Sequence, residues 1–380
     1  MRIVSASLRN FRCFSSLDLD FEKPIVLIHG PNGSGKTSIL EAFHYACYLR
    51  SFKTHLPKEL VLAQAEGFGV GLGLVSQGFD ALSVQFAKSK KTVKLNEQGI
   101  GSYKELYEAY RVITITEDDL QIIQGAPSAR RSFLDTVVLL LDPSHAATSQ
   151  KYRAILNNRN ALLAKGRFDD ESYMLWTEQL LQTSFKIQKA RLDAVKQIES
   201  EAKLLIRELF PLMADSQEEP LTMDYTYARP YSGLQDTMTV QNLIERYPGL
   251  KENELRQKRS LLGAHLDDFV VTYLGKACRT YASRGQQKLV VFLLKMAQLQ
   301  VLKVRGSTGT ILLVDDFMTD FDEDRAAALL PLMTKLSTQV ILTSPLEGII
   351  KNKLPLEITQ SIDLAKLGNT SKKKSFSPDE

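Results

Sequence analysis

The sequence predicts an α/β protein in which a helical lobe interrupts a strand-rich domain. Residues 2–29 and 68–96 show the apolar alternation that is typical of strands. From about residue 116, apolar residues recur every three or four positions, which indicates helices. Buried strands are again predicted at 310–314 and 339–343. Because the order is strand-rich, helical, then strand-rich, a lobe inserted into one α/β domain explains it best.

The composition is that of an ordinary globular protein, with 44% apolar and 24% charged residues. The net charge of +4 permits nucleic-acid binding but does not argue for it. The three cysteines are scattered and form no CxxC pair, so we expect a reducing compartment. Since the N-terminus is unlike a signal peptide and no apolar run is long enough to span a membrane, we expect a soluble, cytoplasmic protein.

Several local patterns refine the elements. The continuous apolar run at 25–28 predicts a strand buried on both faces, and a helix follows Gly35. Gln77–Gly78 is expected to be a turn. In the lobe we expect long helices up to Leu209, an irregular connection at 211–250, and helices at 251–262 and after Gly285. The expected parts are therefore the α/β domain at 1–115 and 300–365, the lobe at 116–299 and a disordered tail at 366–380.

A phosphate-binding loop is predicted at residues 30–37, GPNGSGKT, which fit the pattern GxxxxGK[ST] between a strand and a helix. The glycines let backbone N–H groups surround the phosphates, and the helix N-terminus adds a partial positive charge. Lys36 is expected to reach the β- and γ-phosphates, and the Thr37 hydroxyl to bind Mg²⁺. The expected ATP ligands are Gly30, Pro31, Asn32, Gly33, Ser34, Gly35, Lys36, Thr37 and Ser38.

Two carboxylates follow the apolar strand ILLV at 311–314. Next to a phosphate loop, Asp315 is expected to hold Mg²⁺ through water, and Asp316 to polarise the attacking water as the catalytic group beside Lys36. About thirty residues earlier, SRGQQK at 283–288 opens a helix. Its first residues suit a γ-phosphate, and we expect nucleotide contacts from Ser283, Arg284, Gly285 and Gln286.

The order of these three motifs resembles that of ABC-type ATPases, whose signature usually reads SGGQ. The fold class that we expect is therefore α/β, an ABC-type P-loop ATPase head with an inserted helical lobe. In such ATPases the signature covers the ATP held by a partner. The resemblance therefore implies a homodimer that ATP closes and hydrolysis releases.

Within this class, the chain resembles the RecF family of bacterial DNA replication and repair proteins over nearly its whole length. The motifs that carry the resemblance are LRNFRCF (8–14), RSFKT (50–54), SARRSFLD (128–135), NNRN (157–160), GAHLDDF (263–269), DDFMTDFDEDR (315–325) and QVILTS (339–344). The chain departs from the family pattern at 263–266, where Leu266 replaces an arginine, and at 319–322, an element that usually lines the dimer interface.

The resemblance implies a weak ATPase that acts as a switch, with ATP and Mg²⁺ as cofactors and Arg12 near the nucleotide phosphates. It also implies binding to double-stranded and gapped DNA, where the protein would help RecR and RecO to load RecA. From the residues alone, Lys88, Lys91, Arg130 and Arg131 are candidate DNA contacts, although a solvated basic face or an interhelical pair explains them as well. A cytosolic ATPase that drives a protein assembly without DNA remains the alternative.

Overall fold

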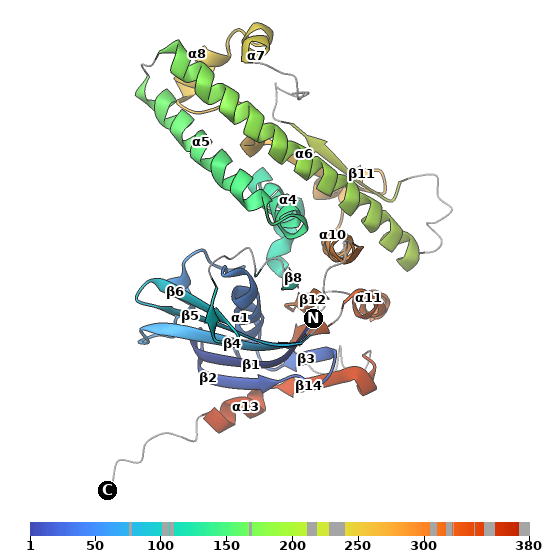
Figure 1. Cartoon of the computed structure of the whole chain (residues 1–380). Helices are drawn as coiled ribbons and strands as arrows, with labels where there is room; N and C mark the ends of the chain where they lie inside the picture. The colour runs from blue at the N-terminus through green and yellow to red at the C-terminus, as the bar shows by residue number, and fades with distance from the viewer. Residues whose placement is uncertain are drawn as a thin grey trace. The chain divides into compact units, whose positions relative to one another are not determined.

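The structure is a computed structural model of the chain, and it describes all residues except several short segments. These are 76–77, 101–105, 107–109, 167–168, 211–218, 228–239, 305–309, 317–320, 322, 338, 346–353 and 372–380. The chain divides into two compact units, where sequence analysis expected boundaries after residues 115 and 299. Unit 1 combines Met1–Asp119 with Gln298–Glu380, and unit 2 is Leu120–Ala297. In Figure 1, unit 1 therefore contains both the blue N-terminal part and the red C-terminal part of the chain.

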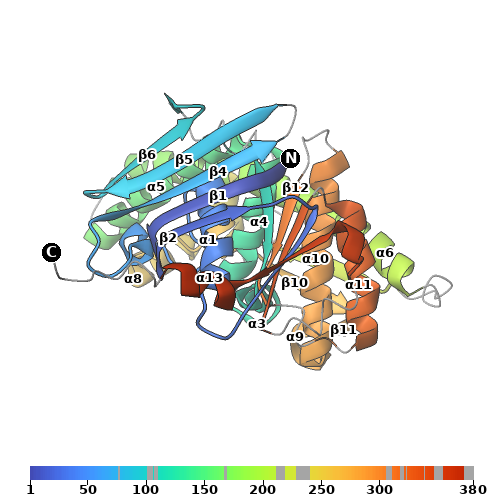
Figure 2. The ribbon, with the colours of Figure 1, turned by 90° about the horizontal axis from the view of Figure 1, so that it is seen from below.

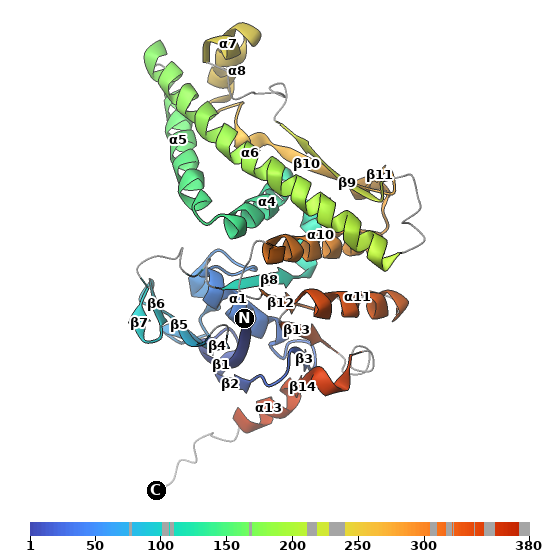
Figure 3. The same ribbon diagram turned by 45° about the vertical axis from the view of Figure 1, so that its right-hand side comes forward.

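A five-stranded parallel sheet forms the base of unit 1. Its order is β14 (Thr359–Asp363), β3 (Ile25–His29), β13 (Gln339–Ser344), β12 (Thr310–Val314) and β8 (Arg111–Ile115), as Figure 3 shows. Every neighbouring pair is parallel, so the carboxyl ends of the strands meet at one edge. All residues of β3, β12 and β13 are buried, which confirms the strands predicted from their apolar runs.

A six-stranded antiparallel sheet forms the second layer of unit 1 (Figure 2). Its order is β2 (Phe14–Asp20), β1 (Arg2–Phe11), β4 (Gly67–Val75), β5 (Phe79–Ala87), β6 (Lys90–Leu95) and β7 (Gln98–Gly99). Helix α1 (Lys36–Tyr48) packs against strands of both sheets. Ten of its thirteen residues are buried, so its position is fixed by both layers.

The C-terminal part of unit 1 corrects one expectation. The remaining elements of this unit are η1 (Pro57–Leu60), η2 (Glu117–Leu120, which ends in unit 2), α11 (Glu323–Leu336), η6 (Leu356–Ile358) and α13 (Leu364–Ser371). Residues 366–371 are helical rather than disordered. The reason is local, because Leu364 is buried and the Asp363 carboxylate accepts a hydrogen bond from the Ala365 N–H at the helix start. The rest of the expected tail, 372–380, lies outside the described residues, as do Gln77 and most of 319–322.

Unit 2 begins with four helices, α3 (Gln121–Gln124), α4 (Pro127–Leu141), α5 (His145–Lys165) and α6 (Asp170–Leu209). Helices α5 and α6 lie side by side (Figure 1). Asp169 caps the forty-residue α6 by accepting a hydrogen bond from the Ser172 N–H at 2.6 Å. Gly166 ends α5 in the left-handed conformation, with φ of 71°. The long helices predicted for the lobe are therefore confirmed.

The second half of unit 2 contains strands that sequence analysis did not predict. Its elements are β9 (Leu221–Thr226), α7 (Val240–Arg246), α8 (Leu250–Gln257), η4 (Ala264–Leu266), β10 (Asp268–Tyr273), β11 (Lys276–Ala277), α9 (Cys278–Tyr281) and α10 (Arg284–Val304, which ends in unit 1). The three strands form an antiparallel sheet. The expectation of an irregular connection at 211–250 is thus wrong for its described part. The helix expected at 251–262 ends at Gln257, because Lys258 adopts a left-handed conformation with φ of 54°.

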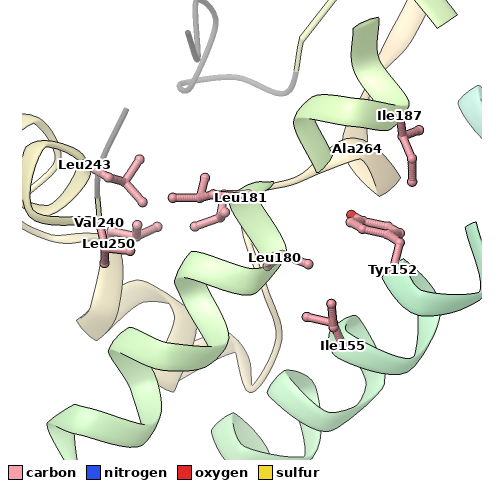
Figure 4. Close-up of a cluster of buried hydrophobic side chains, with 10 residues drawn as sticks. Tyr152, Ile155, Leu180, Leu181, Ile187, Val240, Leu243, Leu250 and Ala264 are labelled. Atoms are coloured by element: carbon pink, nitrogen blue, oxygen red, sulfur yellow. The ribbon is translucent and has the colours of Figure 1, made fainter. Parts of the chain in front are cut away.

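A cluster of apolar side chains from α5, α6, α7 and α8 forms a core of unit 2 (Figure 4). Tyr152, Ile155 and Leu180 belong to it and lie in the part of the lobe where apolar spacing predicted helices. Helices α5 and α8 also carry a fully buried ion pair, in which Arg159 donates to both oxygens of Glu254 at 2.9 and 2.6 Å. This pair ties α5 to α8, and its burial makes it a structural element of the lobe.

Candidate functional site

The predicted phosphate loop lies at the carboxyl edge of the parallel sheet, between β3 and α1. Gly30, Gly33 and Gly35 have φ of 151°, 80° and 95°, values that disfavour other residues. A Cβ on Gly35 would lie 2.4 Å from the Phe14 ring and 2.7 Å from the Cys13 Sγ. The loop conformation and its close contact with the β1–β2 turn therefore require glycine at this position.

Lys36 is 6% exposed and curls back over the loop. Its ammonium donates hydrogen bonds to the Gly30 and Pro31 carbonyls at 2.8 and 3.2 Å. The Ser34 hydroxyl oxygen is buried and has no hydrogen-bond partner among the described residues. A buried cation and an unsatisfied hydroxyl within a ring of glycine-dependent backbone fit a polyphosphate. The residues present thus suit ATP.

The predicted Mg²⁺ ligands are brought together by hydrogen bonds. The Thr37 hydroxyl donates to the Asp315 carboxylate at 2.9 Å, across 278 residues of sequence. Asp315 directly follows β12, and its N–H bonds to the Ile115 carbonyl of β8 at 2.8 Å. A hydroxyl and a carboxylate in contact are oxygen ligands of the kind that Mg²⁺ prefers. The donor set therefore fits the expected metal.

Thr343 organises both acidic residues, a role that sequence analysis did not assign. Its hydroxyl donates to Asp315 at 2.9 Å and accepts a hydrogen bond from the Asp316 N–H at 2.9 Å. Thr343 lies on β13, between the phosphate-loop strand β3 and the acidic strand β12. Asp316 has φ of 50°, an uncommon value for a non-glycine residue. The Thr343 hydroxyl helps to hold this backbone. The sequence places Thr343 in the motif QVILTS at the end of an apolar strand but does not indicate this role.

Arg12 is engaged by a carboxylate rather than exposed beside the phosphate loop. Its guanidinium binds both oxygens of Glu41 on α1, at 2.8 and 2.7 Å, and the Glu59 carbonyl at 2.9 Å. The hydrogen bond to Glu41 raises the pKa of Arg12 above its ordinary value. Glu41 is 1% exposed and also accepts a hydrogen bond from the Ser51 hydroxyl. The predicted approach of Arg12 to a nucleotide would require it to leave or share this carboxylate.

The signature segment lies in unit 2, at the start of α10. The Ser283 N–H donates to the Gln286 amide oxygen at 2.9 Å, and the Gln286 N–H donates to the Ser283 hydroxyl at 3.3 Å. This reciprocal pair is a capping box. Ser283 and Arg284 are exposed and Gly285 is half-buried, whereas Gln287 is buried against the Gln124 side chain. The cap fixes the exposed end of the helix in one conformation.

For the candidate DNA contacts in unit 2, the structure favours the alternative explanation, contacts within the protein. Arg130 is 6% exposed and bonds to both carboxylate oxygens of Asp268 at 2.6 and 2.9 Å. Arg131 is half-buried and donates to the Asp267 carbonyl at 2.7 Å. Desolvation and the nearby Arg191 lower the pKa of Arg131. Both guanidiniums hold α4 to the start of β10, so their charges serve the fold of this unit.

The two candidate DNA contacts on the β5–β6 hairpin, Lys88 and Lys91, differ in exposure. Lys88 is exposed at the turn, with φ of 50°. Lys91 instead points inward, where its ammonium donates to the Leu49 carbonyl at 2.8 Å and lies 5.5 Å from the centre of the Tyr45 ring. Burial lowers the pKa of Lys91. A direct DNA contact by Lys91 therefore conflicts with its position, whereas Lys88 remains accessible.

His265 belongs to the divergent 263–266 element and is structural. Its Nδ1 lies 2.7 Å from the Tyr152 hydroxyl and its Nε2 lies 3.4 Å from the Ser260 carbonyl. Burial lowers the pKa of His265 to about 4. A neutral ring that accepts from Tyr152 and donates to Ser260 satisfies this geometry.

Comparisons with known proteins identify the family of the chain. The family model described as "AAA domain" matches residues 5–259, more than half of the chain, which therefore carries this domain. The DNA replication and repair protein RecF of Chlorobaculum parvum is 30% identical over 351 residues, which cover 90% of this chain and 94% of the relative. The chain belongs to the RecF family. The RecF protein of Natranaerobius thermophilus is 28% identical over 359 residues, covering 90% of this chain and 91% of the relative.

Solved structures give the same fold. A structure of the recombination mediator protein RecF-ATPrS in the RecFOR pathway superposes with a TM-score of 0.79, at 24% identity, and covers 92% of this chain and 94% of the other. An Smc head bound to the C-winged helix domain of ScpA reaches a TM-score of 0.51 at 13% identity, with 92% of each chain covered. The predicted resemblance and the predicted P-loop ATPase head with a helical insertion are confirmed.

None of the described helices combines the length and apolar character needed to pass through a lipid bilayer.

Proposed function

We propose that this RecF-family chain is an ATP-dependent DNA-binding switch with weak ATPase activity in recombinational repair and replication restart. The observation that carries the proposal is the hydrogen-bonded set of Thr37, Asp315 and Thr343 beside the buried Lys36. These groups are held by α1 and three neighbouring parallel strands, so they are preorganised for a nucleotide. The curated relatives named above, DNA replication and repair proteins, support DNA as the partner.

In this proposal each side chain has a distinct task at the phosphates. Bound Mg²⁺, held by Thr37 and by Asp315 through water, would neutralise phosphate charge. Lys36 would leave the Gly30 and Pro31 carbonyls and donate to the β- and γ-phosphate oxygens. Asp316 would orient the attacking water, and its short side chain would keep hydrolysis slow. A slow reaction suits a switch, because the ATP-bound state then lasts long enough to act.

The exposed signature segment supports a shared site between two copies. Ser283 and Arg284 are accessible at a capped helix start, and the Ser283 hydroxyl can still donate while its oxygen accepts from Gln286. In the proposed homodimer this end of α10 would cover the ATP of the partner. Contacts with RecR and RecO, and the loading of RecA at gapped duplex, are the expected downstream steps.

The test is a titration of gapped duplex DNA with the purified protein, with and without a slowly hydrolysed ATP analogue and Mg²⁺, at two salt concentrations. We expect binding that needs the nucleotide and weakens with salt. The control is Lys36→Ala, which should lose ATP-dependent dimerisation in light scattering while keeping its circular dichroism spectrum. DNA binding that is equally tight with and without the nucleotide would contradict the proposed switch. An absence of DNA binding would favour an ATPase that drives a protein assembly instead.

A further inference from the structure

A basic loop follows the phosphate-loop helix in unit 1. Residues 50–58, RSFKTHLPK, contain one arginine, two lysines and a histidine but no carboxylate. Arg50, Lys53, His55 and Lys58 are all exposed. Cations that gather on a segment without acids create a local positive potential, which attracts polyanions.

The near end of this loop is anchored to α1. The buried Ser51 hydroxyl donates to the Glu41 carboxylate and accepts hydrogen bonds from the N–H groups of Lys53 and Thr54 at 2.8 and 3.1 Å. One residue further, the Phe52 ring packs edge-on against His44, with ring centroids 5.4 Å apart. Since Glu41 and His44 both belong to α1, the loop takes its shape from that helix.

The far end of the loop is closed by a second set of bonds. The Thr54 hydroxyl donates to the Glu59 carboxylate and accepts from the Leu56 N–H at 3.1 Å. The Glu59 carbonyl in turn accepts from Arg12 at 2.9 Å. A loop backbone held in this way loses little conformational entropy when it binds, so the backbone that carries the charged side chains is already ordered.

A lysine of the neighbouring hairpin joins the loop to the antiparallel sheet. The Lys91 ammonium donates to the carbonyl of Leu49, the residue that ends α1 in a left-handed conformation and precedes the loop. Lys91 lies on β6 just after the turn that carries the exposed Lys88. This bond places the hairpin turn and the start of the loop on one edge of unit 1.

We propose that the loop Arg50–Lys58, together with Lys88, is a binding surface for DNA backbone phosphates, and that Lys91 positions it without touching the DNA. Charge complementarity selects the occupant, because the exposed Arg50, Lys53 and Lys58 outnumber the one neighbouring carboxylate, Glu59, and attract backbone phosphates. Backbone contacts of this kind set the position of DNA and do not read its sequence. The inference rests on the proposed DNA-binding function and assigns residues to it.

The surface and the nucleotide site share one helix. Lys36 and Thr37 lie at the start of α1, and the loop is anchored at Glu41, His44 and Leu49 toward its end. A helix of thirteen residues spans about 20 Å and is stiff over that length. A displacement of α1 on nucleotide binding would therefore be passed directly to the loop.

The first experiment measures the salt dependence of duplex binding for Lys53→Gln/Lys58→Gln in the full chain with the ATP analogue. The slope of log K against log salt is negative, and each lost phosphate contact makes it shallower by about 0.9. For two contacts, the ratio of affinities at 50 and 200 mM salt should fall by about 12-fold relative to the unmodified protein. The matched control Lys165→Gln/Lys276→Gln removes the same charge from exposed positions of unit 2 and should keep the original slope.

The second experiment uses Lys91→Met, which keeps the aliphatic stem but loses the bond to Leu49. We expect several-fold weaker DNA binding at every salt concentration with an unchanged slope, since no phosphate contact is removed. A slope reduced by about 0.9 would show that Lys91 itself meets a phosphate, and the positioning role would be wrong.

The outcomes separate this inference from the function on which it rests. If the unmodified protein shows no ATP-dependent DNA binding, the proposed function fails. If it binds DNA but the Lys53/Lys58 variant keeps the slope of the matched control, the function stands and this surface is refuted. Binding of a fluorescent ATP analogue by each variant checks that unit 1 is folded.

Discussion

The clearest prediction concerns Thr343, the residue that bridges the two acidic side chains. Thr343→Val keeps the volume of a side chain that is 1% exposed but removes its hydroxyl. The variant loses the donor to the Asp315 carboxylate and the acceptor of the Asp316 N–H, both at 2.9 Å. The change therefore isolates hydrogen bonding from packing.

The magnitude follows from these two bonds. A hydrogen bond to a charged group contributes about 1.5–3 kcal/mol, and a buried donor that loses its acceptor costs about 1–3 kcal/mol. Because about 1.4 kcal/mol corresponds to a tenfold change, a loss at the lower end of these ranges slows ATP hydrolysis by about tenfold or more. The Asp316 backbone, with φ of 50°, is expected to relax once its N–H is released.

The assay is ATP hydrolysis at saturating Mg²⁺-ATP, together with thermal unfolding with and without nucleotide. Thr343→Ser is the matched control, because it keeps the hydroxyl and loses only a methyl group. We expect the serine variant to stay within a few-fold of the unmodified rate and the valine variant to fall well below it. Equal rates and equal unfolding temperatures for the two variants would refute the bridging role of the hydroxyl.

Three further predictions follow from the geometry. Gly35→Ala should abolish binding of a fluorescent ATP analogue, because the added Cβ would clash with the neighbouring β1–β2 turn. In Gly33→Ala the added Cβ meets no atom within 4 Å, so this variant should lose only the ~1–2 kcal/mol of folding free energy that a left-handed conformation costs a non-glycine residue. Glu254→Gln should destabilise the helical lobe by about 3–5 kcal/mol in urea unfolding, because Arg159 is left buried without its counter-charge, and unchanged unfolding would contradict this. His265 has a folded pKa of about 4 against 6.5 in the unfolded chain, so the unfolded state binds more protons between these values. Its contribution to stability should be complete above pH 6.5 and fall as the pH drops toward 4, and unfolding of His265→Gln should depend less on pH in that window.

The nucleotide site was predictable because its chemistry is local in the sequence. The phosphate loop needs glycines at fixed spacing before Lys36 and Thr37, and the structure places these residues between β3 and α1. Asp315 and Thr37 were both assigned to Mg²⁺ because two carboxylates after an apolar strand are typical of a chain with a phosphate loop, and the structure places the two side chains 2.9 Å apart. Local patterns were sufficient here.

The residues that support the site, such as Thr343 and Glu41, were not predictable, because their partners are distant in the sequence. Thr343 and Glu41 act through partners 27 to 29 residues away, and nothing in the sequence indicates which distant residue each one contacts. Arg130 and Arg131 illustrate the same limit, because the sequence left DNA contact and an internal pair open, and their partners, Asp268 and Asp267, lie more than 130 residues further along the chain. Burial of a charge depends on such distant partners, which a single sequence does not reveal.

Two carboxylate-centred clusters meet on helix α1, and their arrangement bears on how the switch would work. Thr37 and Glu41 are four residues apart, which places them on the same side of the helix. Thr37 connects α1 to Asp315 of the nucleotide site, and Glu41 connects it to Arg12 and to the basic loop through Ser51. A rotation or shift of α1 would therefore move both Thr37 at the nucleotide site and Glu41 at the anchor of the basic loop. The site at which ATP is proposed to bind and the surface at which DNA is proposed to bind are therefore mechanically linked within unit 1, before any contribution from a second copy of the chain.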